Sequence, residues 1–392
     1  MNVAFVHYAY INGGLERITL DIIKYLSSAY NNKYKFFLYS IIFDDGRRAE
    51  LESYNVTTRK LRKEKTLRTI DTKTFLINDK IDLVVQSSFP IWNIENIQKE
   101  TGVKVIFANH GEPFWERFSL IRRKQSTRIK RLRWKLYRKH LYRILNYPMR
   151  RTIRKTKAIY RKCDAYTVLC EPYKTQMCKA FKIKPENSHI YAIENPEYAV
   201  EKPNLNKEKM ILFCGRLENT SKRVDLLLEI WQKIQDKLPD WRLVLIGEGP
   251  NEIELKNMAQ ELNLHDIYFI GAVKNPSTYY RRASIVCLTS QTEGWGLALT
   301  EGQAHGCIPI AFACSDGVKI IIGEDQTTGF LVKPGDVEAY ADTLVKVAQL
   351  PEEQKIKIRE AAIKKRLKYT PEIMGQKWNE LFDSLVHSIE NN

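Results

Sequence analysis

The stretch SIVCLTSQTEGWGLALTE, residues Ser284–Glu301, decides the fold expected of this 392-residue chain. Its first part, Ser284–Ser290, is an apolar run typical of a buried strand. A turn with Gly294 and Gly296 follows, and the apolar spacing then becomes helical. A strand, a glycine turn and a helix in this order are the unit of a parallel sheet covered by helices. The backbone N–H groups at such a helix start attract anions, and glycine lets a phosphate come close.

The same stretch carries two carboxylates, Glu293 and Glu301, which lie eight residues apart. Glu293 is in the turn, where it can meet a sugar hydroxyl, and Glu301 is on the helix, where it can accept from a ribose hydroxyl. Taken alone, the pattern also fits a glycine turn with two solvated glutamates.

Outward from this stretch, apolar strands alternate with helical patterns in both halves of the chain. Glu194–Lys209 is polar, contains two prolines and is typical of a linker. Two such series predict two doubly wound domains, in which ligands bind beyond the carboxyl ends of the strands. The expected strands are Val3–Tyr8, Lys35–Ile42, Ile81–Ser87, Val103–Asn109, Tyr166–Cys170 and His189–Ile193, then Met210–Cys214, Trp241–Ile246, Ile267–Ile270, Ser284–Ser290, Cys307–Phe312 and Phe330–Val332. We expect the tail from Glu352 to Ile389 to be helical throughout.

A second motif, Phe213-Cys-Gly-Arg-Leu-Glu-Asn-Thr-Ser-Lys-Arg223, follows the first strand of the second series. Arg216 and Lys222 share one loop and can converge on a diphosphate, Arg as a planar fork and Lys as a point charge. Arg223 is a weaker third candidate. A solvated basic loop is the alternative interpretation.

Two further signals lie in the first half. Asn12-Gly13-Gly14-Leu15-Glu16-Arg17 follows the first strand, and a double glycine before a helix is a turn that can touch a phosphate or an acceptor. Asn109-His110-Gly111 ends another strand. A lone histidine is more often structural than catalytic, but at a strand's carboxyl end we expect His110 to position a substrate.

These motifs, in this order, resemble the family-4 glycosyltransferases, which have the GT-B architecture of two Rossmann-like domains facing across a cleft. The family's signature is Glu-x7-Glu after a strand of the C-terminal domain, as in Glu293 and Glu301. Gly13-Gly14-x-Glu-Arg and Gly247-Glu-Gly249-Pro also match family patterns, and the resemblance covers nearly the whole chain. It implies a retaining, metal-independent hexosyltransferase, with the acceptor hydroxyl attacking from the side of the leaving group and a donor phosphate oxygen taking the proton.

The resemblance also implies roles for single residues. Arg216 and Lys222 would neutralise the leaving nucleoside diphosphate, and His110 would contact the donor sugar. The segment Gly271-Ala-Val273 would contact the base through its backbone. We therefore expect His110, Glu293, Arg216 and Lys222 to be catalytic. The expected donor-binding residues are Gly13, Gly14, Gly215, Arg216, Lys222, Val273, Glu293, Gly296, Leu297, Ala298 and Glu301. No metal and no cofactor is expected, since the donor is a substrate.

The expected organisation has three parts. Residues 1–196 form an acceptor-binding domain with a basic helical insertion at about 120–162. Residues 197–370 form the domain that binds the UDP- or GDP-sugar. Residues 371–392 form a helix that crosses back, so that the C-terminal helices pack toward the N-terminal domain.

The positive charge is concentrated in one segment. Arg117–Cys163 contains 19 lysines and arginines and no acid, so removing it from the net charge of +17 leaves the rest at −2. The cations of 122–162 are interleaved with aromatic residues, which is typical of a helix at an anionic lipid surface. A solvated basic helix face is the alternative, and no nucleic-acid recognition fold is apparent.

Targeting features point to the inner face of the cell membrane. The N-terminus lacks the pattern of a signal peptide, and no apolar stretch approaches 18 residues. Seven cysteines without a C-x-x-C spacing indicate reduced, buried thiols. We expect a cytoplasmic, peripheral enzyme acting on a lipid-linked or glycan acceptor in polysaccharide synthesis. The alternatives are a nucleotide-sugar epimerase or hydrolase of the same fold, and a non-catalytic nucleotide-binding protein.

Overall fold

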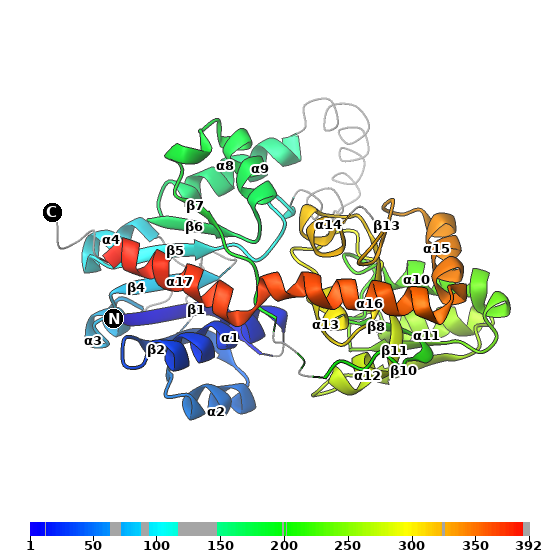
Figure 1. Cartoon of the computed structure of the whole chain (residues 1–392). Helices are drawn as coiled ribbons and strands as arrows, with labels where there is room; N and C mark the ends of the chain where they lie inside the picture. Colours follow the sequence, from blue (N-terminus) through cyan, green and yellow to red (C-terminus); the bar gives the residue numbers. More distant parts are fainter. Residues whose placement is uncertain are drawn as a thin grey trace. The chain divides into compact units, whose positions relative to one another are not determined.

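The structure is a computed structural model of the whole chain (Figure 1). It describes residues 1–11, 13–62, 72–87, 94–116, 147–197, 200, 202–323 and 326–386. The chain forms two compact units. The first comprises Met1–Glu194 with Gly375–Asn392, and the second comprises Asn195–Met374.

The first unit is built on a seven-stranded sheet of order β3-β2-β1-β4-β5-β6-β7. Its strands are all parallel, as buried apolar strands linked by helices usually are. They are β1 Asn2–Tyr10, β2 Lys35–Phe43, β3 Thr57–Lys60, β4 Leu83–Ser87, β5 Lys104–Ala108, β6 Ala165–Val168 and β7 Ile190–Ala192. The described helices are α1 Gly14–Ala29, α2 Asp45–Ser53, α3 Thr72–Asn78, α4 Ile94–Thr101, α8 Tyr147–Tyr160, α9 Glu171–Phe181 and the short 3-10 helix Pro185–Asn187.

The second unit has a six-stranded parallel sheet of order β10-β9-β8-β11-β12-β13. Its strands are β8 Glu208–Cys214, β9 Arg242–Ile246, β10 Ile267–Gly271, β11 Ala283–Leu288, β12 Ile308–Phe312 and β13 Phe330–Val332. The helices are α10 Val224–Ile234, α11 Glu252–Glu261, α12 Ser277–Arg282, α13 Leu297–Ala304, α14 Asp316–Ile322, α15 Val337–Gln349 and α16 Glu352–Arg366, with 3-10 turns at Gln235–Lys237 and Leu367–Tyr369.

Both sheets have the doubly wound strand order, in which the chain reverses direction across the sheet beside its first strand. In the first unit this switch point lies between β1 and β4, and in the second it lies between β8 and β11. Crevices at such points are where ligands bind in open α/β sheets. The topology therefore directs attention to the loops after β8 and β11.

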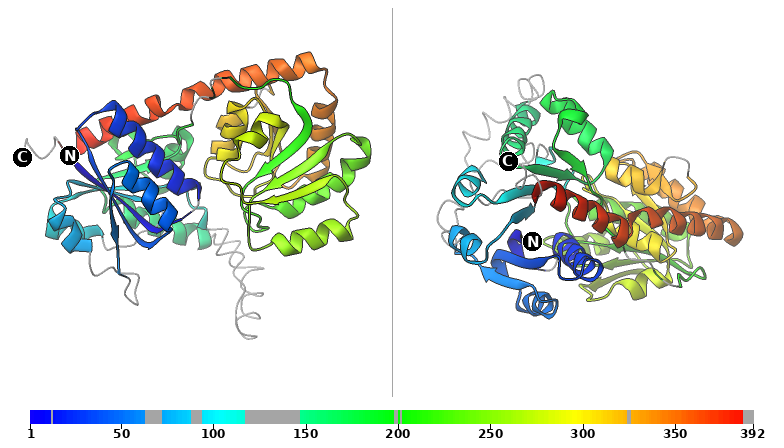
Figure 2. Two further views of the ribbon diagram at one scale, coloured as in Figure 1. Left: turned by 90° about the horizontal axis from the view of Figure 1, so that it is seen from below. Right: turned by 60° about the vertical axis from the view of Figure 1, so that its left-hand side comes forward.

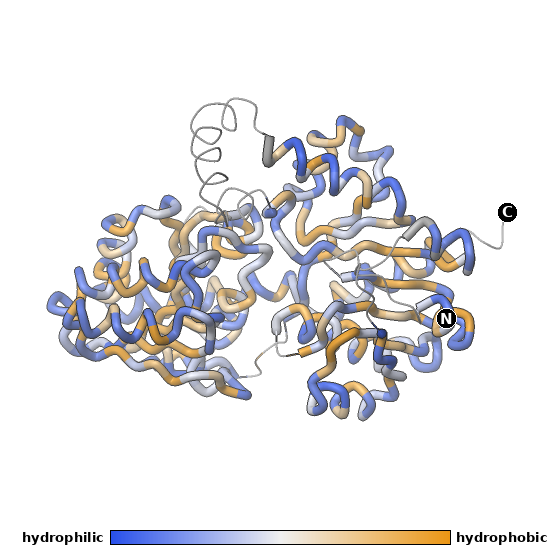
Figure 3. The backbone as a smooth tube through the Cα atoms, turned by 180° about the vertical axis from the view of Figure 1, so that it is seen from behind, coloured by the Kyte–Doolittle hydropathy of each residue, from blue (hydrophilic) through white to orange (hydrophobic). Residues whose placement is uncertain are grey.

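The core of the second unit explains why its strands are largely apolar. Alternate residues such as Phe213, Leu245 and Ile310 pack with α10, α11 and α15 in one cluster. The residues between them face the other side, where Gly302 of α13 lies against Val286. In Figure 3 the outer helices alternate between blue and orange, because one side of each helix faces a sheet.

The tail from Glu352 was expected to be helical throughout, and its described part is helical except at Thr370, where two helices are separated. Helix α16 ends at Arg366, the turn Leu367–Tyr369 follows, and α17 begins at Pro371 and runs to Val386. Pro371 lacks a backbone N–H, which makes it a poor residue for a helix interior and a good one for a first turn. Residues 387–392 lie outside the described residues.

The part of α17 from Gly375 onward packs within the first unit (Figure 2). Lys33 forms an ion pair with Asp383 at 2.7 Å, and the rings of Tyr34 and Phe382 meet edge to face at 5.8 Å. Gly375 lies so close to the ring of Tyr25 that a side chain at this position would overlap it. These contacts explain why the last helix groups with the first unit.

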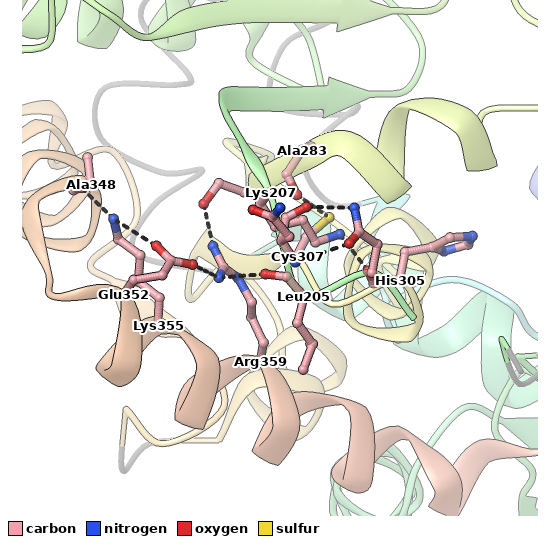
Figure 4. A network of polar contacts seen from close by, with 12 residues as sticks. Leu205, Lys207, Ala283, His305, Cys307, Ala348, Glu352, Lys355 and Arg359 are labelled. Atoms are coloured by element: carbon pink, nitrogen blue, oxygen red, sulfur yellow. Dashed lines mark hydrogen bonds and ion pairs between the residues drawn. The ribbon is translucent and has the colours of Figure 1, made fainter. Parts of the chain in front are cut away.

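A buried arginine joins α16 to the sheet of the second unit (Figure 4). Arg359 is 1% exposed, and its guanidinium donates to Ser284 Oγ at 2.8 Å and to the carbonyl of Leu205 at 3.0 Å. It also pairs with Glu352. A buried cation is costly unless it is paired and hydrogen-bonded, so these partners fix the position of α16.

The basic insertion expected at about 120–162 lies mostly outside the described residues. Its described part contains α8, of which Thr152, Thr156 and Tyr160 are buried. The exposed positions include Arg150, Arg151, Arg154 and Lys155. Across the described part of the chain, every helix is too short or too polar to span a membrane.

Candidate functional site

An ion pair lies at the switch point of the second unit. Lys222, in the loop after β8, places its Nζ 2.6 Å from Oε2 of Glu293, in the loop after β11. The two side chains are 25% and 15% exposed, so they are partly shielded from water yet reachable. The structure thus brings together two of the residues that sequence analysis singled out.

The loops that carry this pair are joined to each other by hydrogen bonds. The amide of Gln291 donates to the carbonyl of Ser221 at 2.7 Å, and Thr289 Oγ donates to the carbonyl of Lys222 at 3.2 Å. Ser290 Oγ donates to Glu293 at 3.2 Å. The position of the ammonium relative to the carboxylate is therefore set by the backbone as well as by their mutual attraction.

The pair also determines the charge state of Lys222. Burial acts to lower its pKa, but the charge of Glu293 and the hydrogen bond to it act to raise it, as do Cys314 and Glu218. The net result is a pKa above the ordinary lysine value. Lys222 is therefore positively charged at neutral pH and can bind an anion.

Helix α13 begins beside this pair. Gly296 precedes it with a φ of +101°, a left-handed conformation that glycine adopts without strain. Leu297 and Ala298 form its first turn, where backbone N–H groups have no partner within the helix. The helix start and Lys222 together supply positive potential at one edge of the sheet. Glu301 follows in the middle of α13 and is half-buried.

The other predicted donor-site residues of this unit lie at the same edge. Gly215 follows β8 directly, and Arg216 after it is exposed. Gly271 ends β10, and its carbonyl accepts from the amide of Gly247 at 2.9 Å. Val273 follows two residues later and is half-buried. The loops after β8, β9 and β10 are therefore neighbours, as their positions in the sheet require.

Arg223, the weaker third candidate for binding the diphosphate, is paired with a carboxylate of its own turn. Its guanidinium makes a bidentate contact with the carboxylate of Asp225 at 2.8–3.0 Å, next to the start of α10. Both side chains are about a quarter exposed. Its charge is thus paired within its own turn.

The first unit holds the remaining predicted residues. Gly13 precedes α1 and Gly14 is its first residue, whereas Asn12 of the same motif lies outside the described residues. His110 follows β5 and is half-buried. His110 lies close enough to His7 of β1 for its charge to act on that ring.

His7 was not predicted from the sequence. It is 1% exposed, and its Nε2 lies 3.0 Å from Thr19 Oγ. Burial, with a smaller effect of His110, lowers the pKa of His7 to about 3, so it is neutral at physiological pH. Its position inside the apolar run of β1 was the signal available, because a histidine there must be buried or paired.

Comparison with solved structures shows the fold. The Anabaena protein HepE, solved in complex with UDP-glucose, superposes over 98% of this chain and 100% of its own with a TM-score of 0.75 at 14% identity. A sucrose-phosphate synthase from Thermosynechococcus elongatus gives a TM-score of 0.74 at 15% identity, over 99% of both chains. The fold is therefore GT-B, with two parallel-sheet Rossmann-like units.

Residues 195–365 match the family model described as Glycosyl transferases group 1. The match lies almost entirely within the second unit. An uncharacterized glycosyltransferase of Haemophilus influenzae is 38% identical over 193 residues, 48% of this chain and 53% of that protein. The amylovoran biosynthesis glycosyltransferase AmsD of Erwinia amylovora is 26% identical over 241 residues, 59% of this chain and 66% of its own. The matches thus span between half and two thirds of these relatives.

Proposed function

We propose that this protein is a retaining, metal-independent glycosyltransferase. It moves a hexose-type sugar from a UDP- or GDP-sugar to a hydroxyl of a lipid-linked or glycan acceptor. The observation that carries the proposal is the Lys222–Glu293 pair beside the start of α13, inside the region that matches the glycosyl transferases group 1. Fixed positive groups at this edge suit a diphosphate, and a carboxylate next to them suits a sugar hydroxyl.

In the proposed reaction the bond between the anomeric carbon and the donor phosphate breaks, and a bond to the acceptor oxygen forms on the same face. The acceptor proton passes to a phosphate oxygen of the leaving group. Lys222, Arg216 and the amides of Leu297 and Ala298 stabilise the negative charge that grows on the nucleoside diphosphate. Glu293 holds a sugar hydroxyl, Glu301 accepts from the ribose, and His110 positions the donor sugar.

A donor screen by thermal shift tests this proposal. UDP, GDP and their hexose conjugates are added to the wild-type protein, to Glu301→Ala and to Lys222→Ala. One nucleotide at about 100 times its Kd should stabilise the wild type by about 2.7 kcal/mol. Both variants should lose most of the shift. A wild-type protein that none of the nucleotides stabilises would count against the donor site.

The reaction itself is then followed with the donor so identified. Transfer with the anomeric configuration conserved, as read by NMR, and undiminished by EDTA supports a retaining, metal-independent enzyme. An epimerised or hydrolysed donor without transfer would contradict it. The relatives offer acceptor classes to try, since one of them is named a poly(ribitol-phosphate) alpha-N-acetylglucosaminyltransferase of Staphylococcus aureus.

We further propose that the protein acts at the cytoplasmic face of the membrane, through anionic lipid. The described support is α8, whose exposed side carries Arg150, Arg151, Arg154 and Lys155 while its other side is buried. Each basic residue near an anionic surface contributes about 1 kcal/mol. Four such residues on one helix face therefore suit a peripheral contact.

Sedimentation with vesicles tests this contact. Replacing Arg150, Arg151, Arg154 and Lys155 by glutamine should weaken binding to phosphatidylserine vesicles at low salt by at least tenfold, given the contribution of each cation. The matched control loses the same charge from exposed sites of the second unit, namely Lys237, Lys357, Lys364 and Lys368. Equal binding by both variants, or no binding by the wild type, would refute a role for α8.

A further inference from the structure

A group of polar residues that no sequence motif includes lies next to α13, the helix that carries Glu301. Lys207 comes from the segment before β8, Tyr280 from α12 and His305 from the end of α13. Lys207 and His305 are seen together in Figure 4, beside the buried Cys307. All three residues contact the segments that carry Glu301, so their arrangement bears on where its carboxylate lies.

Lys207 holds the ends of two helices. Its Nζ donates to the carbonyls of Tyr280 at 3.0 Å, Arg281 at 3.1 Å and His305 at 2.6 Å. The first two carbonyls lie at the end of α12 and the third at the end of α13, where the helix dipoles are negative. An ammonium has three donors, and all three are used here.

The charge of Lys207 persists at neutral pH. Burial lowers its pKa to about 8, with the neighbouring arginines adding to the effect. The ammonium form therefore prevails at pH 7, and it is the form that can satisfy three carbonyls at once. Lys207 thus makes three hydrogen bonds that an apolar side chain could not make.

His305 contacts the backbone of Glu301 within α13. Its Nδ1 lies 2.8 Å from the carbonyl of Glu301, so this nitrogen carries the proton. Its ring stacks on that of Tyr280, with centroids 5.6 Å apart and planes at 25°. Burial lowers the pKa of His305, which favours the neutral ring.

Tyr280 brings a hydroxyl close to the Glu301 side chain. The residue is 1% exposed, and its oxygen has no well-formed hydrogen bond among the described residues. Burial raises its pKa, and the Glu301 carboxylate and the Cys214 thiol lie near enough to raise it further. A buried phenol is a hydrogen-bond donor, and a neighbouring carboxylate is an acceptor suited to it.

We propose that Lys207, His305 and Tyr280 are positioning residues that fix the carboxylate of Glu301 for a ribose hydroxyl. Lys207 and His305 hold the helix, and the Tyr280 hydroxyl orients the carboxylate. The contact between Glu301 and a ribose hydroxyl rests on the proposed function. The contacts that hold α13 do not depend on a ligand.

Tyr280→Phe is the most selective test, because it removes one hydroxyl and keeps the ring that stacks on His305. Titration calorimetry with UDP and GDP should show about tenfold weaker binding of the preferred nucleotide, as for a lost hydrogen bond to a charged group. Tyr279→Phe makes the same change at the neighbouring, half-exposed position and should bind as the wild type does. Unchanged affinity in Tyr280→Phe, with affinity lost in Glu301→Ala, would overturn the inference and leave the proposed function intact.

A double mutant shows whether Tyr280 acts through Glu301. In a Glu301→Ala background, Tyr280→Phe should cause no further loss of affinity, because contacting residues are not additive when one acts through the other. An added tenfold loss would mean that Tyr280 acts by another route and would overturn the proposal.

Hydrogen exchange tests the helix without any nucleotide. Lys207→Met should speed amide exchange across residues 299–306, and Lys207→Arg, which keeps a cation, should restore part of the protection. Faster exchange would support the positioning of α13 even if the wild type bound neither UDP nor GDP, in which case the proposed donor function alone would fail. Unchanged exchange in Lys207→Met would overturn the role of Lys207.

Discussion

Lys222→Ala is expected to lower the rate of sugar transfer by about two to three orders of magnitude, as when one preorganised donor to a developing negative charge is removed. The ammonium is held 2.6 Å from Glu293 by two loops that are hydrogen-bonded to each other. These loops are fixed before any ligand binds. The Lys222 ammonium therefore needs little rearrangement when negative charge develops on the leaving group. The loss should therefore appear in kcat as well as in the affinity for the nucleotide.

Two variants make this result specific. Lys222→Arg keeps the charge but replaces a point donor by a planar fork, so it should recover only part of the rate. Lys209→Ala removes a lysine from an exposed pair with Asp240, whose side chains are 58% and 71% exposed. Such surface pairs contribute little, and this variant should match the wild type. A Lys222→Ala enzyme with more than a tenth of the wild-type kcat would contradict the role of the ammonium.

Except for β3, the strands and the residues at their carboxyl ends were predictable because a parallel sheet imposes a local pattern. A strand buried on both faces is a short continuous apolar run, as in Met210–Cys214, and a polar loop must follow it. Lys222 and Glu293 were found because each lies in the loop that follows such a run. Their contact could be anticipated only from the strand order, which places β8 beside β11.

The residues that sequence analysis missed have no local signal. Lys207 lies in a polar stretch and Arg359 in a helix rich in charged residues, where cations normally face water. Both are instead held against carbonyls or hydroxyls of segments far away in the chain. Tyr280 likewise looks like an ordinary helix residue until α13 is placed beside it. Such roles arise from packing between elements, and spacing along one element does not encode them.

Gly247→Ala is expected to destabilise the second unit, because two of its loops meet backbone to backbone at this glycine. Its φ is +132°, and an added Cβ would overlap the carbonyl of Gly215. The amides of Gly215 and Leu217 donate to the carbonyls of Ile246 and Glu248, both at 2.9 Å. Relieving the overlap would separate the two loops and break these two hydrogen bonds. It would also displace Arg216, which lies between them in the chain.

The size of the effect follows from two separate costs, strain and overlap. Gly335 has a φ of +79° with no atom within 4 Å of the place for a Cβ, so Gly335→Ala measures strain alone, about 1–2 kcal/mol. Gly247→Ala adds the overlap and should cost about 3 kcal/mol or more in urea unfolding. It should also weaken nucleotide binding, whereas Gly335→Ala should not. Equal destabilisation by the two variants would mean that the loops separate without cost, and that Gly247 does not hold the Arg216 loop in place.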